Sequence, residues 1–204
     1  MKVLFIRHGQ TIINIDGKIH KVNDDAGLTD LGKKQAEILA GVCKRQGVEA
    51  IYSSPEIRAM ETARITGEKL SITPIIEVDL AERNWGDWSN QMWEQIQRRL
   101  KTMSIEERFS FTPPNGESWE QMETRLMDAL NSIVEHPYKV VAIITHSGAM
   151  RALMPVLHGK PKDISFKYEF HNGSITIFNY EDGKWYSVRE NDMNHFAGKI
   201  PWSQ

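Results

Sequence analysis

The chain has 204 residues, with 25 Lys and Arg against 27 Asp and Glu, and a formal net charge of −2. Because 40% of the residues are hydrophobic and 25% are charged, the composition excludes a disordered chain and favours one globular domain with a sizeable core. No apolar run is long enough to cross a bilayer, and the near-zero charge gives no general attraction to nucleic acid or to a membrane.

The amino-terminal half predicts alternating strands and helices. A run of large apolar residues from Lys2 to Ile6 is typical of a strand buried on both faces, and it ends at Arg-His-Gly. Helical spacing predicts a helix over Asp30 to Gln46, with Thr29 as its cap and Gly47 as its stop. The next expected elements are a strand over Glu49 to Ser53, a helix that starts at Pro55, and a strand over Thr73 to Val78.

The pattern then loosens. Short helices over Gln91 to Lys101 and Ser104 to Phe109 form a predicted excursion, at about residues 83–117, that we expect to lie over the active site. The next expected elements are an amphipathic helix over Trp119 to Ile133, a strand over Lys139 to Ile144, and a helix over Met150 to Leu157 that stops near Gly159.

The carboxyl-terminal part predicts hairpins. Ser165 to Phe170 and Ser174 to Tyr180 are strand-like segments around Asn172-Gly173, and Trp185 to Val188 could pair after a turn at Asp182-Gly183. We therefore expect a single domain over residues 1–204 with an α/β fold. Its architecture would be a three-layer α/β/α sandwich, with a mostly parallel sheet and antiparallel strands at the carboxyl-terminal edge.

The single cysteine, Cys43, falls on the apolar face of a predicted helix, so we interpret it as a buried small hydrophobe rather than a reactive thiol. The first apolar stretch is too short for a secretory signal, which favours a reducing, cytoplasmic location.

Polar residues follow several of the predicted strands. In open α/β sheets, ligands bind at the carboxyl ends of the strands, where the loops converge. This rule selects Arg7 and His8 after the first strand, Arg58 after the second, Glu82 after the third and His146 after the fourth. We expect two histidines, two arginines and one carboxylate to meet on one rim.

These residues suit phosphoryl transfer. The transferred group carries negative charge on three oxygens, which the planar, permanently charged guanidinium groups of Arg7 and Arg58 can bind, joined by His146. A neutral imidazole is a competent nucleophile near pH 7, and nearby arginines lower the pKa of a histidine. We therefore predict that His8 attacks phosphorus, and that its other ring nitrogen donates to a backbone carbonyl.

The motifs around these residues resemble those of the histidine phosphatase superfamily, also called the phosphoglycerate mutase-like family. The resemblance covers most of the chain in the family's order: Arg7-His8-Gly9-Gln10-Thr11 with Asn14; Gly27-Leu28-Thr29 with Gly32, Gln35 and Ala36; Ser53-Ser54-Pro55 with Arg58, Thr62 and Ala63; Leu80 to Trp88; Pro114 to Ser118; and His146-Ser147-Gly148 with Arg151.

The resemblance implies a metal-independent phosphomonoester hydrolase that acts on a small phosphorylated metabolite through a phosphohistidine intermediate, without a cofactor. Glu82 matches the family's general-acid position and would protonate the leaving oxygen. Gln10, Thr11 and Asn14 resemble positions that contact phosphate or support the pocket, and Gln10 stands where many members carry glutamate.

Several alternatives stay open. The backbone of Ser147 and Gly148 could face an anion or could simply start a helix, and the same holds for residues 116–118. A phosphoglycerate mutase is the second enzymatic reading, disfavoured by the compact interval between Glu82 and His146, and a non-catalytic phospholigand-binding module is the third.

Other features point away from a metal and leave the substrate undetermined. The remaining histidines lack HExxH or paired-cysteine spacing, so no metal site is expected. For Trp85, Trp88 and Trp93 we favour packing over contact with substrate. The stretch at residues 20–25 departs from the family's usual Gln-Gly and Asp-x-Pro pattern near the pocket, so no particular substrate is predicted. The antiparallel carboxyl-terminal strands could support a homodimer by edge pairing.

Overall fold

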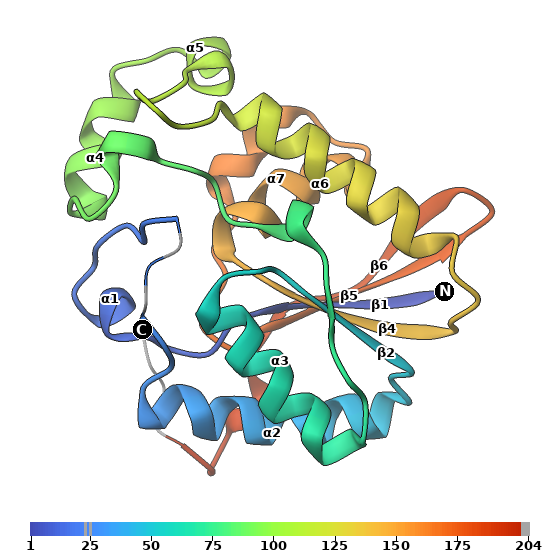
Figure 1. Ribbon diagram of the computed structural model, residues 1–204. Coiled ribbons are helices and arrows are strands. Elements are labelled where there is room, and N and C mark those ends of the chain that lie inside the picture. Colours follow the sequence, from blue (N-terminus) through green and yellow to red (C-terminus); the bar gives the residue numbers. More distant parts are fainter. Residues whose placement is uncertain (23, 25, 201–204) are drawn as a thin grey trace.

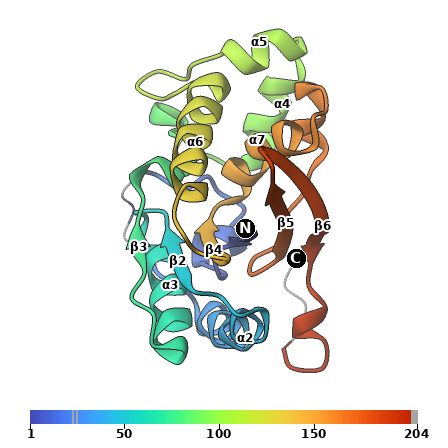
Figure 2. The ribbon, with the colours of Figure 1, turned by 90° about the vertical axis from the view of Figure 1, so that its right-hand side faces the viewer.

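In the computed structural model, which describes residues 1–22, 24 and 26–200, one mixed sheet of six strands has helices on both faces (Figure 1). The strands are β1 Lys2–Arg7, β2 Ala50–Ser53, β3 Ile75–Ile76, β4 Val140–Thr145, β5 Ile175–Glu181 and β6 Lys184–Asp192. Their order across the sheet is β3-β2-β4-β1-β5-β6, as the view in Figure 2 shows. The first four are mutually parallel, whereas β5 and β6 pair antiparallel. The predicted parallel sheet with antiparallel edge strands is confirmed.

The helices are α1 Ile12–Ile15, α2 Asp30–Gln46, α3 Ile57–Leu70, α4 Trp93–Lys101, α5 Ile105–Ser110, α6 Trp119–Val134 and α7 Ser147–His158. Helices α2 and α3 cover one face of the sheet, and α6 and α7 cover the other (Figures 1 and 2). Alternate residues of β1 belong to the two resulting cores: Leu4 and Ile6 pack with α2 and α3, whereas Val3 and Phe5 pack with α6 and α7. This explains the continuous apolar run of β1.

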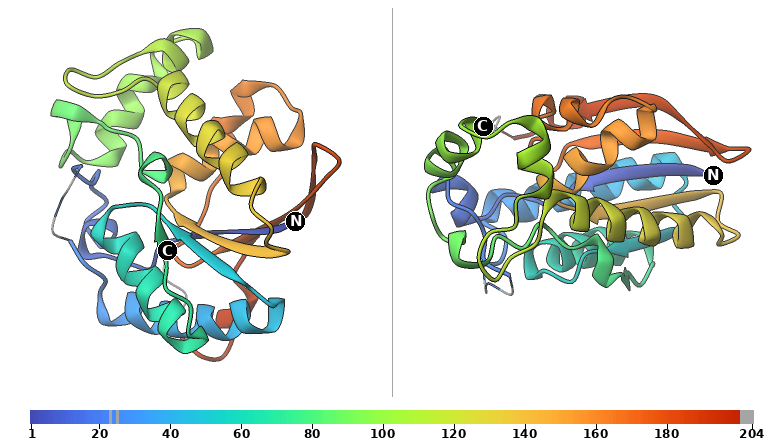
Figure 3. Two further views of the ribbon diagram at one scale, coloured as in Figure 1. Left: turned by 45° about the vertical axis from the view of Figure 1, so that its right-hand side comes forward. Right: turned by 90° about the horizontal axis from the view of Figure 1, so that it is seen from above.

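Helices α4 and α5 lie together at the end of the molecule where β1 and β4 finish (Figure 3). They belong to the predicted excursion, whose own small core joins Ile96 and Leu100 to Ile19 and Trp85. No helix in the described ranges has both the length and the hydrophobicity that a membrane crossing requires.

Local signals in the sequence set the bounds of α2. The Thr29 side chain accepts a hydrogen bond from the Gly32 N–H at the start, and Gly47 ends the helix in the left-handed conformation with φ of 73°. Cys43 is fully buried in this helix, and burial raises the pKa of its thiol to about 12, as expected for a small hydrophobe.

Two local predictions need correction, and one short helix was missed. The strand expected over 165–170 is wrong: the chain forms a 3-10 helix over Lys162–Lys167, because Phe166 packs on Trp119 and Phe109 and both edges of β5 are already paired with β1 and β6. The strand expected over 73–78 shortens to β3, since the chain turns into a 3-10 helix at Val78–Leu80. The short helix α1 was not predicted.

Candidate active site

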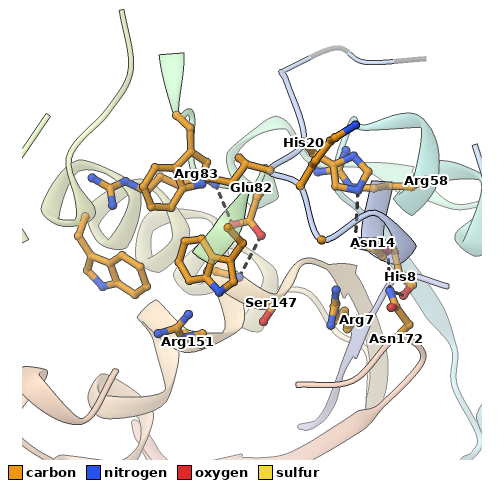
Figure 4. Close-up of a pocket in the computed structure, with 17 residues that line it drawn as sticks. Arg7, His8, Asn14, His20, Arg58, Glu82, Arg83, Ser147, Arg151 and Asn172 are labelled. Carbon is orange, nitrogen blue, oxygen red and sulfur yellow. Dashed lines mark hydrogen bonds between the residues drawn. The ribbon is translucent and has the colours of Figure 1, made fainter. Parts of the chain in front are cut away.

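A pocket of about 330 Å³ opens where the carboxyl ends of β1, β2 and β4 meet the excursion (Figure 4). Four of the five residues selected from the strand ends line it: Arg7, His8, Arg58 and Glu82. The fifth, His146, lies directly behind the lining, with its ring centroid 5.1 Å from that of His8. The five residues that were selected because they follow strand ends therefore lie close together in the structure.

His8 is buried, and its Nδ1 lies 2.7 Å from the carbonyl oxygen of Gly9. A carbonyl accepts hydrogen bonds, so Nδ1 carries the ring proton and Nε2 keeps a free lone pair in the neutral imidazole. Burial lowers the pKa of His8 well below its ordinary value, and the positive charges of Arg58 and Arg7 lower it further. The expected effect of the arginines is present, but burial is the larger cause.

Arg7 and Arg58 each have one buried nitrogen without a hydrogen-bond partner among the described residues: Nε of Arg7 and Nη1 of Arg58, the latter 3.8 Å from Oδ2 of Asp24. Nη1 of Arg7 donates to the Phe170 carbonyl, and Nε of Arg58 donates to Nδ1 of His146. Burial lowers the pKa of Arg7 to about 10, so Arg7 stays charged at neutral pH. The half-buried Arg7 and the buried Arg58 both line the pocket, so their positive charges favour an anion there.

His146 is held by a carboxylate that the sequence analysis missed. Its Nε2 lies 2.9 Å from Oε2 of Glu56 and 2.6 Å from Oγ of Ser54, and Ser54 also contacts Glu56 through a very short hydrogen bond. Burial alone would raise the pKa of Glu56, but His146, Arg58 and the Ser54 hydrogen bond lower it well below its ordinary value. Glu56 therefore supplies the negative charge that keeps this buried cluster stable.

The carboxylate of Glu82 is fixed by two backbone N–H groups. Oε1 accepts from the Arg83 N–H and Oε2 accepts from the Gly148 N–H, each at 2.9 Å. A Cβ atom added to Gly148 would collide with Oε1 of Glu82. The Gly148 amide thus binds Glu82. At the other candidate helix start, Ser118 caps α6 with a capping box, so residues 116–118 begin a helix, which was one of the two interpretations.

The loop after β1 carries the predicted binding residues. Asn14 lines the pocket, and its Oδ1 accepts from the Thr11 N–H and from Nδ2 of Asn172. Gln10 and Thr11 are buried beside the lining: Oε1 of Gln10 accepts from the Thr29 hydroxyl, and Thr11 caps α1. Ser147 and Gly148 line the pocket from α7.

The opposite end of the pocket is aromatic and cationic (Figure 4). The guanidinium of Arg83 lies 4.3 Å from the Trp85 ring centroid, and that of Arg151 lies 5.7 Å from the Trp119 centroid. Nε of Arg151 donates to the Ser165 carbonyl, and burial lowers the pKa of Arg151. Trp85 and Trp93 both line the pocket, although the sequence analysis favoured a packing role for them. Trp88, the third of these tryptophans, is not among the lining residues.

The sequence analysis assigned no role in the site to several of its residues, among them His20, Glu56, Arg83, Arg151 and Asn172. Arg151 and Glu56 stand beside recognised motifs, and His20 lies in the departing stretch at residues 20–25, of which Asn23 and Asp25 fall outside the described residues. Glu56 and Asn172 have partners far along the chain, with 90 residues between Glu56 and His146 and 164 between Asn172 and His8, so local pattern could not reveal them. His20 pairs with Asp24 only four residues away, but its position beside the His8 ring depends on the fold. Among residues 1–22, 24 and 26–200, no group of three or more His, Cys, Asp or Glu is arranged to hold a metal ion.

Comparison with known proteins identifies relatives over nearly the whole chain. A metal-independent phosphoserine phosphatase from Arabidopsis thaliana is 29% identical, covering 96% of this chain and 83% of that protein. A probable phosphoglycerate mutase GpmB from Yersinia pestis (strain Pestoides F) is 26% identical, covering 91% of this chain and 87% of that protein. The structure of a phosphoserine phosphatase mutant from Entamoeba histolytica in complex with phosphoserine is 26% identical, with a TM-score of 0.80, covering 95% and 98% of the two chains.

The family assignment rests on the motifs, the fold and one further match. The model of the histidine phosphatase superfamily (branch 1) matches residues 3–193, which include all of the sheet except Lys2 and every residue of the pocket described above. The chain therefore belongs to the histidine phosphatase superfamily.

Proposed function

We propose that the protein is a metal-independent phosphomonoesterase that acts on a small phosphorylated metabolite through a phosphohistidine intermediate. One observation carries the proposal: His8 is held neutral with Nδ1 bonded to the Gly9 carbonyl, and it faces the pocket between two guanidinium groups that have unsatisfied N–H donors. A neutral nucleophile beside fixed cations is what attack on a phosphoryl dianion requires.

In the first step, Nε2 of His8 attacks phosphorus, and the N–P bond forms as the P–O bond to the leaving group breaks. Arg7 and Arg58, which line the pocket, bind the phosphoryl oxygens with their guanidinium groups and stabilise the charge that is shared among these oxygens. Glu82, held by the Gly148 and Arg83 amides, gives its carboxyl proton to the leaving oxygen.

In the second step, water attacks the phosphohistidine. A proton of that water passes to the Glu82 carboxylate as the N–P bond breaks, which restores both neutral His8 and protonated Glu82. The free phosphate then leaves. The same carboxyl group serves as acid and base because it lies on the side of the leaving group in both steps.

His146 acts through its neighbours in this proposal. Both ring nitrogens are occupied, Nδ1 by Arg58 and Nε2 by Glu56 and Ser54, and its ring lies behind His8. We therefore assign His146 to orientation of the Arg58 guanidinium, rather than to direct contact with a phosphoryl oxygen.

The far end of the pocket favours a substrate with a second anionic group. Glu82 is the one carboxylate in the described lining, against the cations Arg7, Lys18, Arg58, Arg83 and Arg151. One phosphoryl dianion and Glu82 leave positive charge uncompensated beside Arg151 and Trp119. Relatives are named for phosphoserine, which carries a carboxylate. Phosphorylated small acids are the substrate class that we propose to test first.

The decisive experiment measures phosphate release in EDTA from phosphoserine, 3-phosphoglycerate, sugar phosphates, a nucleotide and p-nitrophenyl phosphate. Wild type should release phosphate and His8→Ala should not, although both fold. Release by His8→Ala at the wild-type rate would contradict the covalent route, and the substrate ranking tests the proposed class.

A separate measurement tests the mutase alternative, because one relative is named a probable phosphoglycerate mutase. Interconversion of 3-phosphoglycerate in the presence of 2,3-bisphosphoglycerate, without phosphate release, would favour the mutase. Phosphate binding without either reaction would favour a non-catalytic binding module. A cytoplasmic location, a homodimer and the absence of nucleic-acid partners stay predictions.

A further inference from the structure

Three histidines surround the phosphoryl end of the pocket, and their hydrogen-bond partners differ. His8 has a backbone carbonyl on Nδ1, and no carboxylate contacts it in the described residues. His146 has Glu56 on one nitrogen, but its other nitrogen accepts from Arg58. His20 has Asp24 on Nδ1, and a hydroxyl oxygen lies near Nε2. Their surroundings therefore give the three rings different abilities to carry a positive charge.

His20 and Asp24 form a half-buried pair beside the nucleophile. Nδ1 of His20 lies 2.7 Å from Oδ2 of Asp24, and the two side chains are only 9% and 11% exposed. His20 lines the pocket, and its ring centroid is 5.9 Å from that of His8. Figure 4 shows His20 beside Arg58 and above Asn14. A phosphoryl group bound to His8 would therefore lie within a few ångströms of the His20 ring.

The network around Nε2 of His20 can accommodate either protonation state. In the neutral ring, the Nε2 lone pair faces Nδ2 of Asn14 at 3.5 Å. In the imidazolium, Nε2–H would find the hydroxyl oxygen of Thr11 at 3.1 Å, because the Thr11 hydroxyl hydrogen is directed to Oδ1 of Asn14 at 3.0 Å. Nδ1–H keeps its bond to Asp24 in both states. Addition of a proton thus gives Nε2–H an acceptor in Thr11, at the cost of the long 3.5 Å contact with Nδ2 of Asn14, which is half-buried and lines the pocket.

His146 has different partners from His20. Its Nδ1 accepts a hydrogen bond from Nε of Arg58, and its Nε2 contacts Glu56 and Ser54. His8 lies between Arg58, Arg7 and His146, and its Nε2 must stay free to attack phosphorus. Of the three rings, His20 is the one with both a carboxylate and a ready acceptor.

Charges from every neighbouring element act on His20. Burial lowers its pKa, and Arg58 from α3 and His146 from the end of β4 lower it further, whereas Asp24 raises it. Asp24 also lies 3.8 Å from Nη1 of Arg58, so it faces two cations. Lys18, Glu82 and Arg7 line the same pocket. A phosphoryl dianion would offset the positive charge of Arg58 and add negative charge beside the His20 ring. Both changes favour the imidazolium form of His20.

We propose that His20, held by Asp24, takes up a proton from solvent when a phosphoryl group binds, and so becomes an additional cation of the phosphoryl site. The proton goes to Nε2, and the Nδ1 proton stays between His20 and Asp24. This inference rests on the proposed function, because it requires the phosphoryl group to bind at His8. The charge of His20 then appears only with the ligand, in addition to the fixed charges of the arginines that line the pocket.

Histidine NMR tests the proposal without catalysis. The Hε1 signals are titrated between pH 5 and 9 with and without saturating inorganic phosphate, and His20 is assigned by its loss in His20→Gln. We expect phosphate to raise the midpoint of the His20 titration by at least about one pH unit. His136 is exposed at the opposite end of the strands and serves as the control: at each pH its Hε1 signal should have the same position with and without phosphate.

Calorimetry of phosphate binding in two buffers of different ionisation enthalpy gives the proton count. Wild type should take up more protons per bound phosphate than His20→Gln and Asp24→Asn, which both lack the titrating pair. Equal uptake in wild type and His20→Gln, or a His20 midpoint unmoved while other signals report binding, would overturn the inference and leave the phosphatase proposal standing. No response of any histidine near the pocket to phosphate would contradict both.

Discussion

Replacement of Gly148 by Ala tests whether the position of Glu82 controls protonation of the leaving group. Gly148 opens α7 beside Ser147, and its N–H donates to Oε2 of Glu82 at 2.9 Å. A Cβ atom at this position would occupy the space that Oε1 of Glu82 now fills. The carboxylate must therefore move, although the amide that holds it is unchanged.

The magnitude follows from the displacement. Relief of the overlap requires the carboxylate to shift by roughly 1 Å, and a misplacement of that size can cost about 10²-fold in rate. We expect Gly148→Ala to lower kcat on an alkyl phosphate such as phosphoserine by about 10²-fold. The loss on p-nitrophenyl phosphate should stay below about 10-fold, because its leaving group needs little protonation.

The assay compares kcat for the two substrates in wild type, Gly148→Ala and Gly41→Ala. Gly41 lies within α2, where an added Cβ would meet only the end of the Arg45 side chain, at 3.5 Å. It therefore supplies the same chemical change in a helix away from the pocket, and its activity should match wild type. Thermal unfolding of each variant separates a local effect from loss of the fold.

Equal losses on both substrates in Gly148→Ala would refute the reasoning, since they would mean that Glu82 is not the proton donor or that the helix start itself has moved. An unchanged rate on phosphoserine would show that the carboxylate finds another productive position.

Three further predictions concern the pocket and its supporting charges. Glu82→Gln keeps the size of the side chain but removes the proton, so kcat should fall by about 10² or more on phosphoserine and much less on p-nitrophenyl phosphate; equal losses would remove Glu82 from the acid role. Arg151→Gln should lower kcat/KM about 10-fold for phosphoserine but not for phosphoethanolamine, which lacks the carboxylate, with Arg98→Gln on the exposed face of α4 as control; a parallel fall for both substrates would argue against a second anion. Glu56→Gln should destabilise the protein at pH 7 by about 3 kcal/mol in urea unfolding, because a buried charged partner is lost. The folded-state pKa of Glu56 lies below its ordinary 4.5, so this contribution is present above pH 4.5 and fades as pH falls below it; a difference between the two proteins that stays constant down to pH 3 would contradict this assignment.

Residues at strand ends were predictable because their position depends on local signals. The apolar run of β1 stops at Arg7, the Thr29 cap and Gly47 fix α2, and these features place His8 at the rim whatever the rest of the chain does. The topology rule for open sheets supplied the remaining step, since it needs only the order of strands and loops.

Features that depend on distant partners could not be predicted in this way. Ser165 to Phe170 alternates like a strand, but tertiary packing of Phe166 decides its conformation. Glu56 looks like an ordinary surface charge until the fold brings His146 to it. The same holds for the His20 and Asp24 pair, whose significance comes from the nearby His8 ring.

The close contact between the loop after β1 and the start of α2 has a mechanical consequence. A Cβ atom on Gly9 would lie 2.6 Å from the carbonyl oxygen of Gly32, and Gln10 is tied to α2 through Gln35 and Thr29. Backbone therefore rests on backbone, with no side chain between them to absorb a displacement. We therefore expect the loop that carries His8 and helix α2 to move together as one rigid unit. A split or circularly permuted version of this protein should therefore keep the segment from β1 to α2 continuous. The exposed turn at Asp182 and Gly183 between β5 and β6 is a suitable place for new termini, because it lies outside that segment.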